Sequence, residues 1–514
     1  MVLPGRATYP ILSGPMSRAT NPFPFALPPR PRGASATRWL YESLRAAILG
    51  GRLGVGSRLP TTRELAKHYG LARGTVVTAF ENLKAEGYVS ATVGSGTYVA
   101  CVLPESLLVA PRAARSHGAG PHEARRPRRR LAALARRTSF LPVYDKGPTR
   151  AFRIAQPALD LFPTTLWARV ASRRLRLASA KLLLGCEPLG YEPLRAAIAE
   201  YLVASRGVMC SPEQVAIVSG TLQAMSIVAR LLIDPGDRAV VESPGYIGMW
   251  RALEASGATI VPVPVDDEGL VVDVRRMKHA RLVYVTPAHQ HPMGVSMSVT
   301  RRLALLDWAG RSGATIFEDD YDSEYRYSGP PMPALQGLDR HGRVIFAGSF
   351  SKVLFPSLRL GYVALPPDLV DPFASVVSVT MRHAPLPDQA ILAEFITGGH
   401  FGRHIRRMRE VYAERHAALV SSAKEELSGL LDVCPIEAGL QTVGWLPAGV
   451  DSKRVAALAA ERAVEVRVID PGKGGRAVRH ALQLGFAAVD AAEIRRGVRV
   501  LREVVGGVVA KGER

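Results

Sequence analysis

The sequence predicts a multi-domain protein in which a small basic helical domain precedes a larger α/β domain. The chain has 514 residues, more than one hydrophobic core usually organises, and 47% of them are hydrophobic. Its basic excess is concentrated in the first third. From about residue 150, helical patterns alternate with short apolar strands, which is typical of a mostly parallel sheet covered by helices.

The formal net charge of +21 is unevenly distributed along the chain. Residues 1–100 contribute +8, residues 101–150 another +8, and the remaining 364 residues only +5. A local basic excess favours a polyanionic partner, because binding phosphates releases their counterions. Arginine-rich codon usage in a GC-rich genome is the alternative explanation.

Composition also indicates the compartment. The four cysteines, at positions 101, 186, 210 and 434, show neither CxxC spacing nor a histidine cluster, so we expect no disulfide framework and no zinc site. No apolar run approaches the length of a membrane span, and residues 1–34 read as a disordered Pro-rich tail without the apolar core of a signal peptide. We therefore expect a cytoplasmic protein with no membrane partner; Met16 is a second candidate start.

Residues 35–100 predict three helices followed by a hairpin. The first helix spans 37–49, the second follows a capping-box pair, Thr61 and Glu64, and stops near Gly70, and the third runs from about Arg73 to Gly87. Two short strands, 88–92 and 97–99, then flank a glycine-rich turn. This order predicts a winged helix-turn-helix.

The same region resembles the GntR family of bacterial DNA-binding regulators. The resemblance rests on ordered motifs at family spacing: Gly51-Arg52-Leu53, Arg58-Leu59-Pro60-Thr61-Thr62-Arg63-Glu64-Leu65-Ala66, Ala72-Arg73-Gly74-Thr75-Val76, Glu86-Gly87-Tyr88 and Gly94-Ser95-Gly96-Thr97-Tyr98.

A winged helix-turn-helix of this kind predicts a double-stranded DNA operator as partner. Arg73 and Thr75 stand at the N-terminal end of the third helix, which a recognition helix presents to base edges. Arg63 on the second helix is within reach of DNA, and Ser95 and Gly96 in the wing let backbone amides approach phosphates. Arg63 and Arg73 as solvated surface charges are the alternative.

Residues 101–149 read as a basic flexible linker, rich in Ala, Pro, Gly and Arg, with the run Arg125-Arg126-Pro127-Arg128-Arg129-Arg130 and room for a short helix over 131–137. The larger domain, 150–514, predicts a seven-stranded sheet, with strands at 215–219, 238–242, 259–264, 281–286, 315–318, 344–348 and 360–364. Ligands of such sheets collect at the carboxyl ends of the strands.

One strand end carries the most specific motif, Gly348-Ser349-Phe350-Ser351-Lys352, followed by Pro356-Ser357-Leu358-Arg359-Leu360-Gly361-Tyr362. A lysine here can form an imine with an aldehyde, while Ser349, Ser351 and Arg359 can bind a phosphate dianion. A surface lysine is the alternative. The string predicts that Lys352 anchors pyridoxal 5'-phosphate as a Schiff base.

A second strand ends in a carboxylate cluster, residues 318–324. A buried carboxylate keeps a pyridinium nitrogen protonated, and Asp319 is the choice for this role, with Tyr321 donating to the ring oxygen. We expect Asp320 and Asp322 to be solvated or structural; a metal site is the alternative, and we predict none.

Two further strand ends complete the expected site. Gly220 and Thr221 open a helix whose amides can bind the phosphate, and Tyr246 offers an aromatic face for the ring. In this order the motifs resemble fold-type I pyridoxal-phosphate enzymes, and the whole chain is similar to the MocR subfamily of GntR regulators. The resemblance implies a homodimer with swapped DNA-binding domains, in which the cofactor or its bound ligand tunes operator binding.

Three segments depart from that pattern. The family's His-Gln-aromatic-Pro-Thr-Gly segment is His289-Gln290-His291-Pro292-Met293-Gly294, in which His289 is a cofactor contact or equally a satisfied loop histidine. The cross-subunit tyrosine of a Tyr-Gly-Asp-Pro string is missing from Gly185-Cys186-Glu187-Pro188. Gln483 stands where amino-acid aminotransferases carry an arginine for the substrate carboxylate.

Three functions compete at this point. The first is a regulator that senses the cofactor or an amine or amino-acid effector through the aldimine. The second is an aminotransferase with a DNA-binding appendage, permitted by Lys352, Asp319 and Arg359 but disfavoured by Gln483, for which Arg382 or Arg403 is a candidate substitute. The third is a cofactor-storage or folding scaffold.

Overall fold

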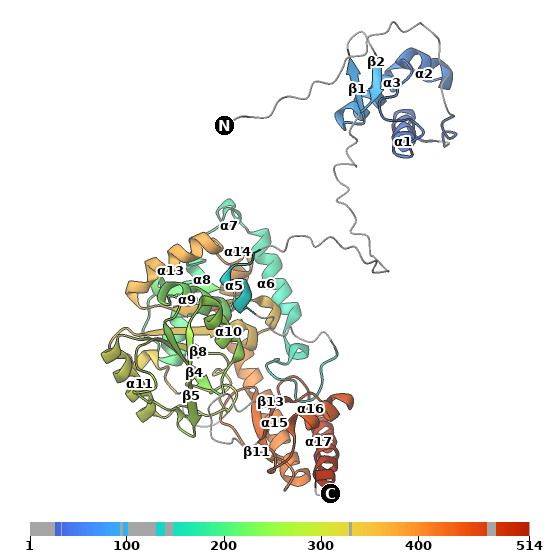
Figure 1. The fold of residues 1–514 in the computed structure, drawn as a ribbon. Coiled ribbons are helices and arrows are strands. Elements are labelled where there is room, and N and C mark those ends of the chain that lie inside the picture. The colour runs from blue at the N-terminus through green and yellow to red at the C-terminus, as the bar shows by residue number, and fades with distance from the viewer. Residues whose placement is uncertain are drawn as a thin grey trace. The chain divides into compact units, whose positions relative to one another are not determined.

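The computed structural model describes residues 26–31, 33–92, 96–100, 130–138, 147–327, 332–469 and 480–512. The chain divides into two compact units, residues 1–128 and 129–514 (Figure 1). None of the described helices is long and apolar enough to cross a membrane.

The first unit is the predicted winged helix-turn-helix. It contains α1 (Ala36–Leu49), α2 (Thr62–Tyr69), α3 (Arg73–Ala85) and the antiparallel pair β1 (Val89–Thr92) and β2 (Gly96–Val99). The capping box of Thr61 and Glu64 forms as expected, and Gly70 ends α2 in the left-handed conformation. All three helices contribute apolar side chains to one core, among them Leu44, Leu65 and Val76.

Part of the expected Pro-rich tail belongs to this unit, which corrects the prediction for residues 26–31 and 33–34. Leu27 is buried in the same core, and its amide donates to the Tyr69 hydroxyl at 3.1 Å. The Trp39 indole N–H donates to the Pro28 carbonyl at 3.1 Å. These contacts satisfy polar groups at the entrance of α1, so the segment is ordered by packing that its composition does not reveal. Residues 1–25 lie outside the described part of the chain.

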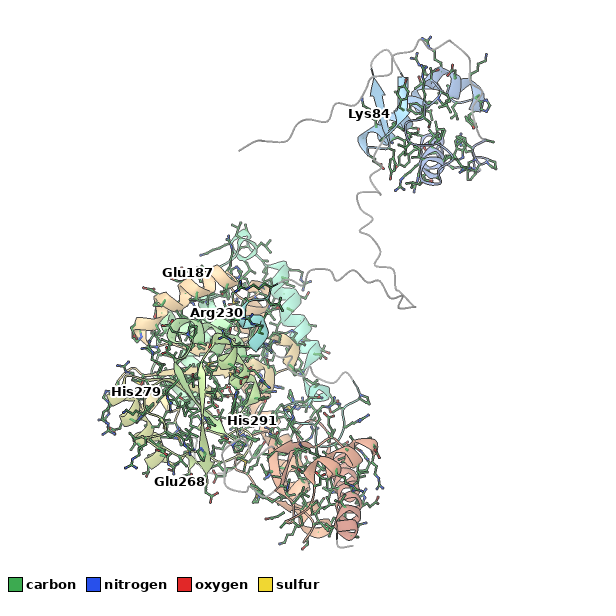
Figure 2. The ribbon with its side chains drawn as sticks, in the orientation of Figure 1. Lys84, Glu187, Arg230, Glu268, His279 and His291 are labelled. Atoms are coloured by element: carbon green, nitrogen blue, oxygen red, sulfur yellow. The ribbon has the colours of Figure 1, made fainter. Side chains whose placement is uncertain are left out.

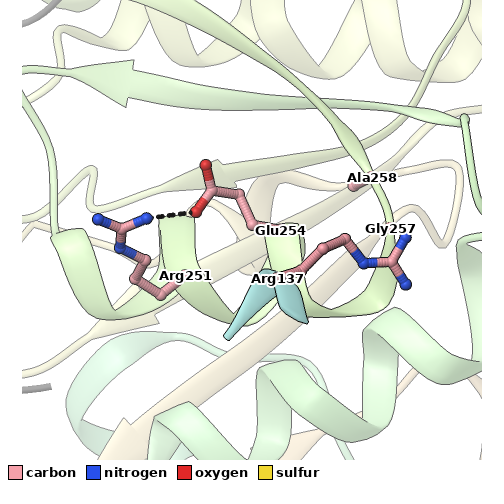
Figure 3. Close-up of a pocket in the computed structure, with 5 residues that line it drawn as sticks. All are labelled: Arg137, Arg251, Glu254, Gly257 and Ala258. Carbon is pink, nitrogen blue, oxygen red and sulfur yellow. Dashed lines mark hydrogen bonds and ion pairs between the residues drawn. The ribbon is translucent and has the colours of Figure 1, made fainter. Parts of the chain in front are cut away.

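A short helix, α5 (Ala133–Arg137), forms within the segment expected to be a linker. It packs against α10 (Ile247–Ser256), and Arg137, Arg251, Glu254, Gly257 and Ala258 line a cavity of about 310 Å³ between them (Figure 3). Gly257 ends α10 with φ +95°, and a Cβ on it would lie 2.8 Å from Nη1 of Arg137. The positive φ favours glycine at this position, and so does the Pro235 backbone, whose Cα would lie 3.2 Å from such a Cβ.

The second unit is built on an eight-stranded sheet of order β3-β10-β9-β8-β7-β4-β5-β6. All seven predicted strands are present: β3 (Val215–Val218), β4 (Arg238–Ser243), β5 (Thr259–Asp266), β7 (Ala280–Val285), β8 (Thr315–Asp320), β9 (Val344–Ser349) and β10 (Gly361–Ala364). The eighth, β6 (Gly269–Leu270), pairs antiparallel with β5 at the edge. Strand β10 is antiparallel to both neighbours, and the sheet is otherwise mostly parallel.

Helices cover both faces of this sheet, as the alternating pattern predicts. Apolar side chains of α9 (Thr221–Leu232), α10 and α13 (Pro367–Thr380) pack on one face. The other face is covered by α8 (Glu192–Arg206), α11 (Val299–Ser312) and α14 (Leu386–Thr397), with α6 (Thr164–Arg176) and α7 (Ala180–Leu184) beside α14. Both faces are buried, which is why these strands read as short apolar runs.

A second sheet of four strands, in the order β11-β12-β14-β13, lies in the C-terminal part. Its strands are β11 (Asp432–Val433), β12 (Gln441–Trp445), β13 (Arg467–Ile469) and β14 (Ala481–Gly485), and all pairs are antiparallel. The long helix α15 (His400–Glu426) packs with α17 (Ala491–Gly512), which also contacts α16 (Ser452–Glu461). Residues 151–155 run along Gly485 and tie this sheet to the start of the unit.

Candidate functional site

The predicted site residues of the larger unit come together at the carboxyl ends of the sheet strands. Each follows or ends a strand or opens the next helix: Gly220 and Thr221 after β3, Tyr246 after β4, His289 after β7, Asp319 and Tyr321 at β8, and Ser349, Ser351, Lys352 and Arg359 after β9. Figure 2 shows His291, of the same loop as His289, between the strands of the large sheet and the C-terminal part.

Lys352 lies on a short helix, α12 (Phe350–Val353), that the strand end positions. The Ser349 hydroxyl caps this helix by accepting from the Ser351 amide at 3.2 Å. The Lys352 amine is half-buried and donates to the Ala155 carbonyl at 2.7 Å. Ala155 has φ 59°, and its own amide donates to Oε1 of Gln441 at 3.2 Å, so strand β12 fixes the carbonyl that receives the lysine.

An anion-binding corner lies beside this lysine. Arg359 donates to the Ser219 carbonyl at 2.7 Å, and its guanidinium lies over Gly220 so closely that a Cβ there would be 3.3 Å from Nη2. Gly220, at φ +102°, is the N-cap of the twelve-residue α9, whose first amides lack helical partners. The buried Ser351 hydroxyl has no partner. Guanidinium, hydroxyl and helix N-terminus together suit a phosphate dianion.

Asp319 provides a buried carboxylate on the opposite side of the site. Its Oδ2 accepts from the Tyr284 hydroxyl at 2.9 Å, whereas Oδ1 is buried without a partner. Burial raises the pKa of Asp319 to about 7, partly offset by the Tyr284 hydrogen bond. A cationic ring N–H would satisfy Oδ1 and keep this carboxylate ionised. The orphan atoms of Asp319 and Ser351 thus fit the two polar ends of pyridoxal phosphate.

Histidine and tyrosine rings line the space between these ends. Tyr246 and His291 stack with ring centroids 5.5 Å apart. His289 is buried, and its Nδ1 lies 3.0 Å from Asp322 Oδ1 and 3.1 Å from the Tyr321 hydroxyl, while its Nε2 has no partner. Asp322 is therefore structural, in that it orients His289, and the Tyr321 hydroxyl already has one neighbour.

The rest of the acidic cluster is structural. Asp320 is buried in an ion pair with Arg206 at 2.7 Å, and Glu318 accepts from the amides of Leu335 and Gln336. Of the two expected roles for Asp320, solvated or structural, the structure shows the structural one. Within the described residues no group of three histidine, cysteine or acidic side chains is arranged to hold a metal ion.

Position 483 is where amino-acid aminotransferases carry the arginine that binds the substrate carboxylate. In this chain strand β14 (Ala481–Gly485) contains no lysine or arginine. Gln483 on β14 is fully buried, and neither atom of its amide group has a partner. Arg382 and Arg403, the two substitutes considered from sequence, are exposed, and Arg403 donates to the Gly398 carbonyl and contacts His400. Neither therefore replaces an arginine at Gln483.

Several site residues could not be predicted from the sequence, because their contacts in the site are with residues far away in the chain. Ala155 and Gln441, which hold Lys352, are 286 residues apart in sequence, and Tyr284 reaches Asp319 from the neighbouring strand. Only Tyr284 had a usable signal, because it lies in the second half of the predicted strand 281–286, towards its carboxyl end.

Removal of the charge at Asp319 should change how stability depends on pH. The raised folded pKa means that the folded protein binds this proton up to about pH 7, whereas the unfolded chain releases it near pH 3.8. Stability is therefore lost as pH rises between these values, by at most about 1.4 kcal/mol per pH unit. In cofactor-free protein, Asp319→Asn should gain in melting temperature relative to the parent between pH 5 and pH 8. A pH-independent difference would contradict this; Glu242 and Glu318, whose pKa values are also raised to about 7, are present in both proteins.

The DNA-binding candidates lie at the expected ends of the helices in the first unit. Arg63 is exposed in the first turn of α2, Arg73 is the exposed first residue of α3, and Thr75 lies in the same first turn. Gly96 begins β2 with φ +120°, and a Cβ there would lie 2.8 Å from Nε of Arg58, which places a further cation at the wing. Ser95 lies outside the described residues.

Comparisons with known proteins match both units. Residues 37–99 match the family of bacterial regulatory proteins, gntR family, and residues 159–501 match aminotransferase class I and II. The chain is 40% identical over 476 residues to the probable rhizopine catabolism regulatory protein MocR of Rhizobium meliloti, covering 92% of this chain and 94% of that protein. It is 31% identical to the pyridoxine biosynthesis regulator PdxR of Corynebacterium glutamicum, covering 92% and 96%.

A solved structure supports the likeness of the larger unit. LysN, the α-aminoadipate aminotransferase from Thermus thermophilus complexed with N-(5'-phosphopyridoxyl)-L-leucine, superposes with a TM-score of 0.64 at 29% identity, covering 70% of this chain and 92% of that one. Fold, site and comparisons define a DNA-binding transcription regulator whose larger domain is built like an aminotransferase. Within this class, the chain belongs to the MocR subfamily of GntR regulators.

Proposed function

We propose that this regulator binds pyridoxal 5'-phosphate at Lys352, and that the cofactor, or an amine bound to it, controls binding of the first unit to a double-stranded DNA operator. The observation that most strongly supports this proposal is that Lys352, Asp319 and Arg359 lie at strand ends of one sheet, in a chain that also contains a winged helix-turn-helix. A ligand controls such a protein only if its affinity differs between the conformations that bind DNA well and poorly.

In this proposal each side chain has one task. Pyridoxal phosphate supplies an aldehyde for amines and an electron-withdrawing ring. Lys352 holds the aldehyde carbon, Asp319 holds the proton on the ring nitrogen, and Tyr246 contacts the ring. Tyr321 would donate to the ring oxygen, and His289 would be a further contact of the cofactor. The phosphate is held by the remaining predicted residues: Gly220, Thr221, Ser349, Ser351 and Arg359.

DNA contacts are assigned to Arg63, Arg73, Thr75, Ser95 and Gly96. Arg73 and Thr75 read base edges in the major groove, Arg63 contacts a phosphate or a base, and the wing contacts the phosphate backbone. By the resemblance we infer a homodimer in which DNA-binding domains are exchanged between subunits, acting in the cytoplasm. The relatives' names point to two different pathways, rhizopine catabolism and pyridoxine biosynthesis, so they do not by themselves identify the effector.

An electrophoretic mobility shift assay tests this function on the DNA upstream of the protein's own gene. Holoprotein and cofactor-free protein are titrated against that fragment and against a scrambled fragment of equal length. We expect a specific complex whose apparent affinity differs at least about fivefold between the two forms, because coupling energies are typically 1–3 kcal/mol. No specific complex in either form, or equal affinity in both without any response to amines, would overturn the proposal.

Aminotransferase activity is the second candidate, because the same three residues permit it. The buried, neutral Gln483 disfavours it, since an amide offers a carboxylate no charge. Conversion of an amino acid and a keto acid above trace rates, lost in Lys352→Ala, would promote this alternative.

A further inference from the structure

The inner face of the small C-terminal sheet presents a polar pair that the proposed function does not use. Strands β13 and β14 are antiparallel, and Arg467 is directly opposite Gln483. Directly opposed residues of neighbouring strands project to the same face of a sheet. On the other side of β14, Val443 of β12 is opposite Gln483 and completes the row.

This face is turned toward the cofactor site. Gln441 lies two residues from Val443 on the same face of β12, and it holds Ala155, the residue whose carbonyl receives Lys352. Met293, from the loop that contains His289 and His291, packs against Val443 and its neighbours Ile469 and Ala481 on this face. The departures from the family pattern at positions 291, 293 and 483 therefore meet in one place.

Electrostatics also places Arg467 near the rings of the site. Burial, followed by the positive charges of His289, Arg467 and Lys352, lowers the pKa of His291 to about 3. His291 is thus neutral at physiological pH, and its buried Nδ1 has no partner. The titratable groups around this space are His289, His291, Lys352 and Arg467, together with three carboxylates: Asp322 on His289, Glu242 on Gln290, and Asp319.

The side chains of Arg467 and Gln483 can both form further hydrogen bonds. Gln483 is fully buried with both amide atoms unpartnered, an arrangement that costs stability unless a ligand or water satisfies it. Arg467 is exposed, and among the described residues no carboxylate lies within ion-pair distance of it; the nearby Glu465 pairs with Arg153.

We propose that Arg467 and Gln483 together bind the carboxylate of an amino-acid effector whose amino group reaches the cofactor at Lys352. The cation that aminotransferases place at position 483 has, in this chain, moved one strand across to β13. A guanidinium supplies charge and two parallel N–H donors, and the Gln483 amide adds a third donor. The inference rests on the proposed function and narrows its effector to amines that carry an anionic group.

Matched pairs of ligands test the inference on holoprotein. L-alanine and ethylamine, and L-phenylalanine and phenethylamine, are titrated while the visible absorption of the cofactor is followed. In the parent, at least one amino acid should bind more tightly than its matched amine. Arg467→Gln should weaken that amino acid about 10- to 100-fold, the size expected for a charge-assisted pair, and leave the amine unchanged. Arg467→Lys should recover part of the loss.

Further variants separate this idea from a loss of structure. Gln483→Arg restores a cation on β14 and should strengthen amino-acid binding, even in the Arg467→Gln background. Arg454→Ala removes another exposed arginine of the same C-terminal part, on α16, and should change nothing. Equal weakening of amino acid and amine, or no preference for an amino acid in the parent, would overturn the inference. Failure to bind the cofactor at all would instead overturn the proposed function, so the two failures are distinguishable.

Discussion

Lys352→Ala is expected to abolish covalent attachment of pyridoxal phosphate and to weaken its binding by at least about two orders of magnitude, about 3 kcal/mol. The half-buried amine donates to the Ala155 carbonyl at 2.7 Å, which fixes its position at the strand end. Borohydride reduction followed by peptide mass spectrometry measures attachment: the parent should carry the reduced cofactor on the peptide that contains Lys352. The variant should carry none.

Two controls make this result specific. Lys352→Arg keeps the charge but cannot form the covalent bond, so it should lose attachment as fully as the alanine variant. Lys278→Ala removes an exposed lysine elsewhere in the same unit and should leave labelling at the parental level. Labelling of another lysine with equal yield in Lys352→Ala would show that the anchor was wrongly assigned.

Arg73→Ala is expected to weaken operator binding by about 1–3 kcal/mol, roughly 5- to 150-fold, and to relax sequence preference at the base pair it contacts. Arg73 is exposed at the first position of α3, where a recognition helix meets base edges, and no acidic residue occupies the first turn. Titration against the operator and against single-base variants, at fixed salt, measures both effects.

Lys84→Ala is the matched control, because Lys84 lies in the last turn of the same helix, away from its N-terminal end (Figure 2). It should retain the parental sequence preference. If Arg73→Ala instead lowered affinity equally for every sequence and reduced the salt dependence by about one ion, Arg73 would be a phosphate contact. Unchanged operator affinity would exclude Arg73 from the interface.

Local patterns were enough to predict most of the two folds. Capping residues and glycines marked the ends of α2 and α3, and apolar runs located seven strands of the large sheet. The small C-terminal sheet was missed because its strands have two to five residues and its pairing joins distant segments, as in Phe152 with Gly485. Such pairing leaves no periodicity in any single stretch of sequence.

The residues of the candidate site also fall into two groups, those that local sequence motifs predict and those that they do not. Lys352, Asp319 and Arg359 stand within motifs whose spacing indicates their chemistry. Their partners Ala155 and Tyr284 come from other parts of the chain, and no motif in the sequence links them to the site. Arg467 is the clearest example, because only the register of β13 with β14 brings it opposite Gln483.

Helix α10 connects the aromatic stack of the candidate site with helix α5. Tyr246, stacked on His291, caps its N-terminal end, and Gly257, beneath Arg137 of α5, caps its C-terminal end. A helix of ten residues is about 15 Å long, and its backbone hydrogen bonds keep this length nearly constant. A ligand that displaces the aromatic stack along the axis of α10 would therefore shift the Gly257 end of the helix, which lies against Arg137 of α5, the first described helix after the DNA-binding domain.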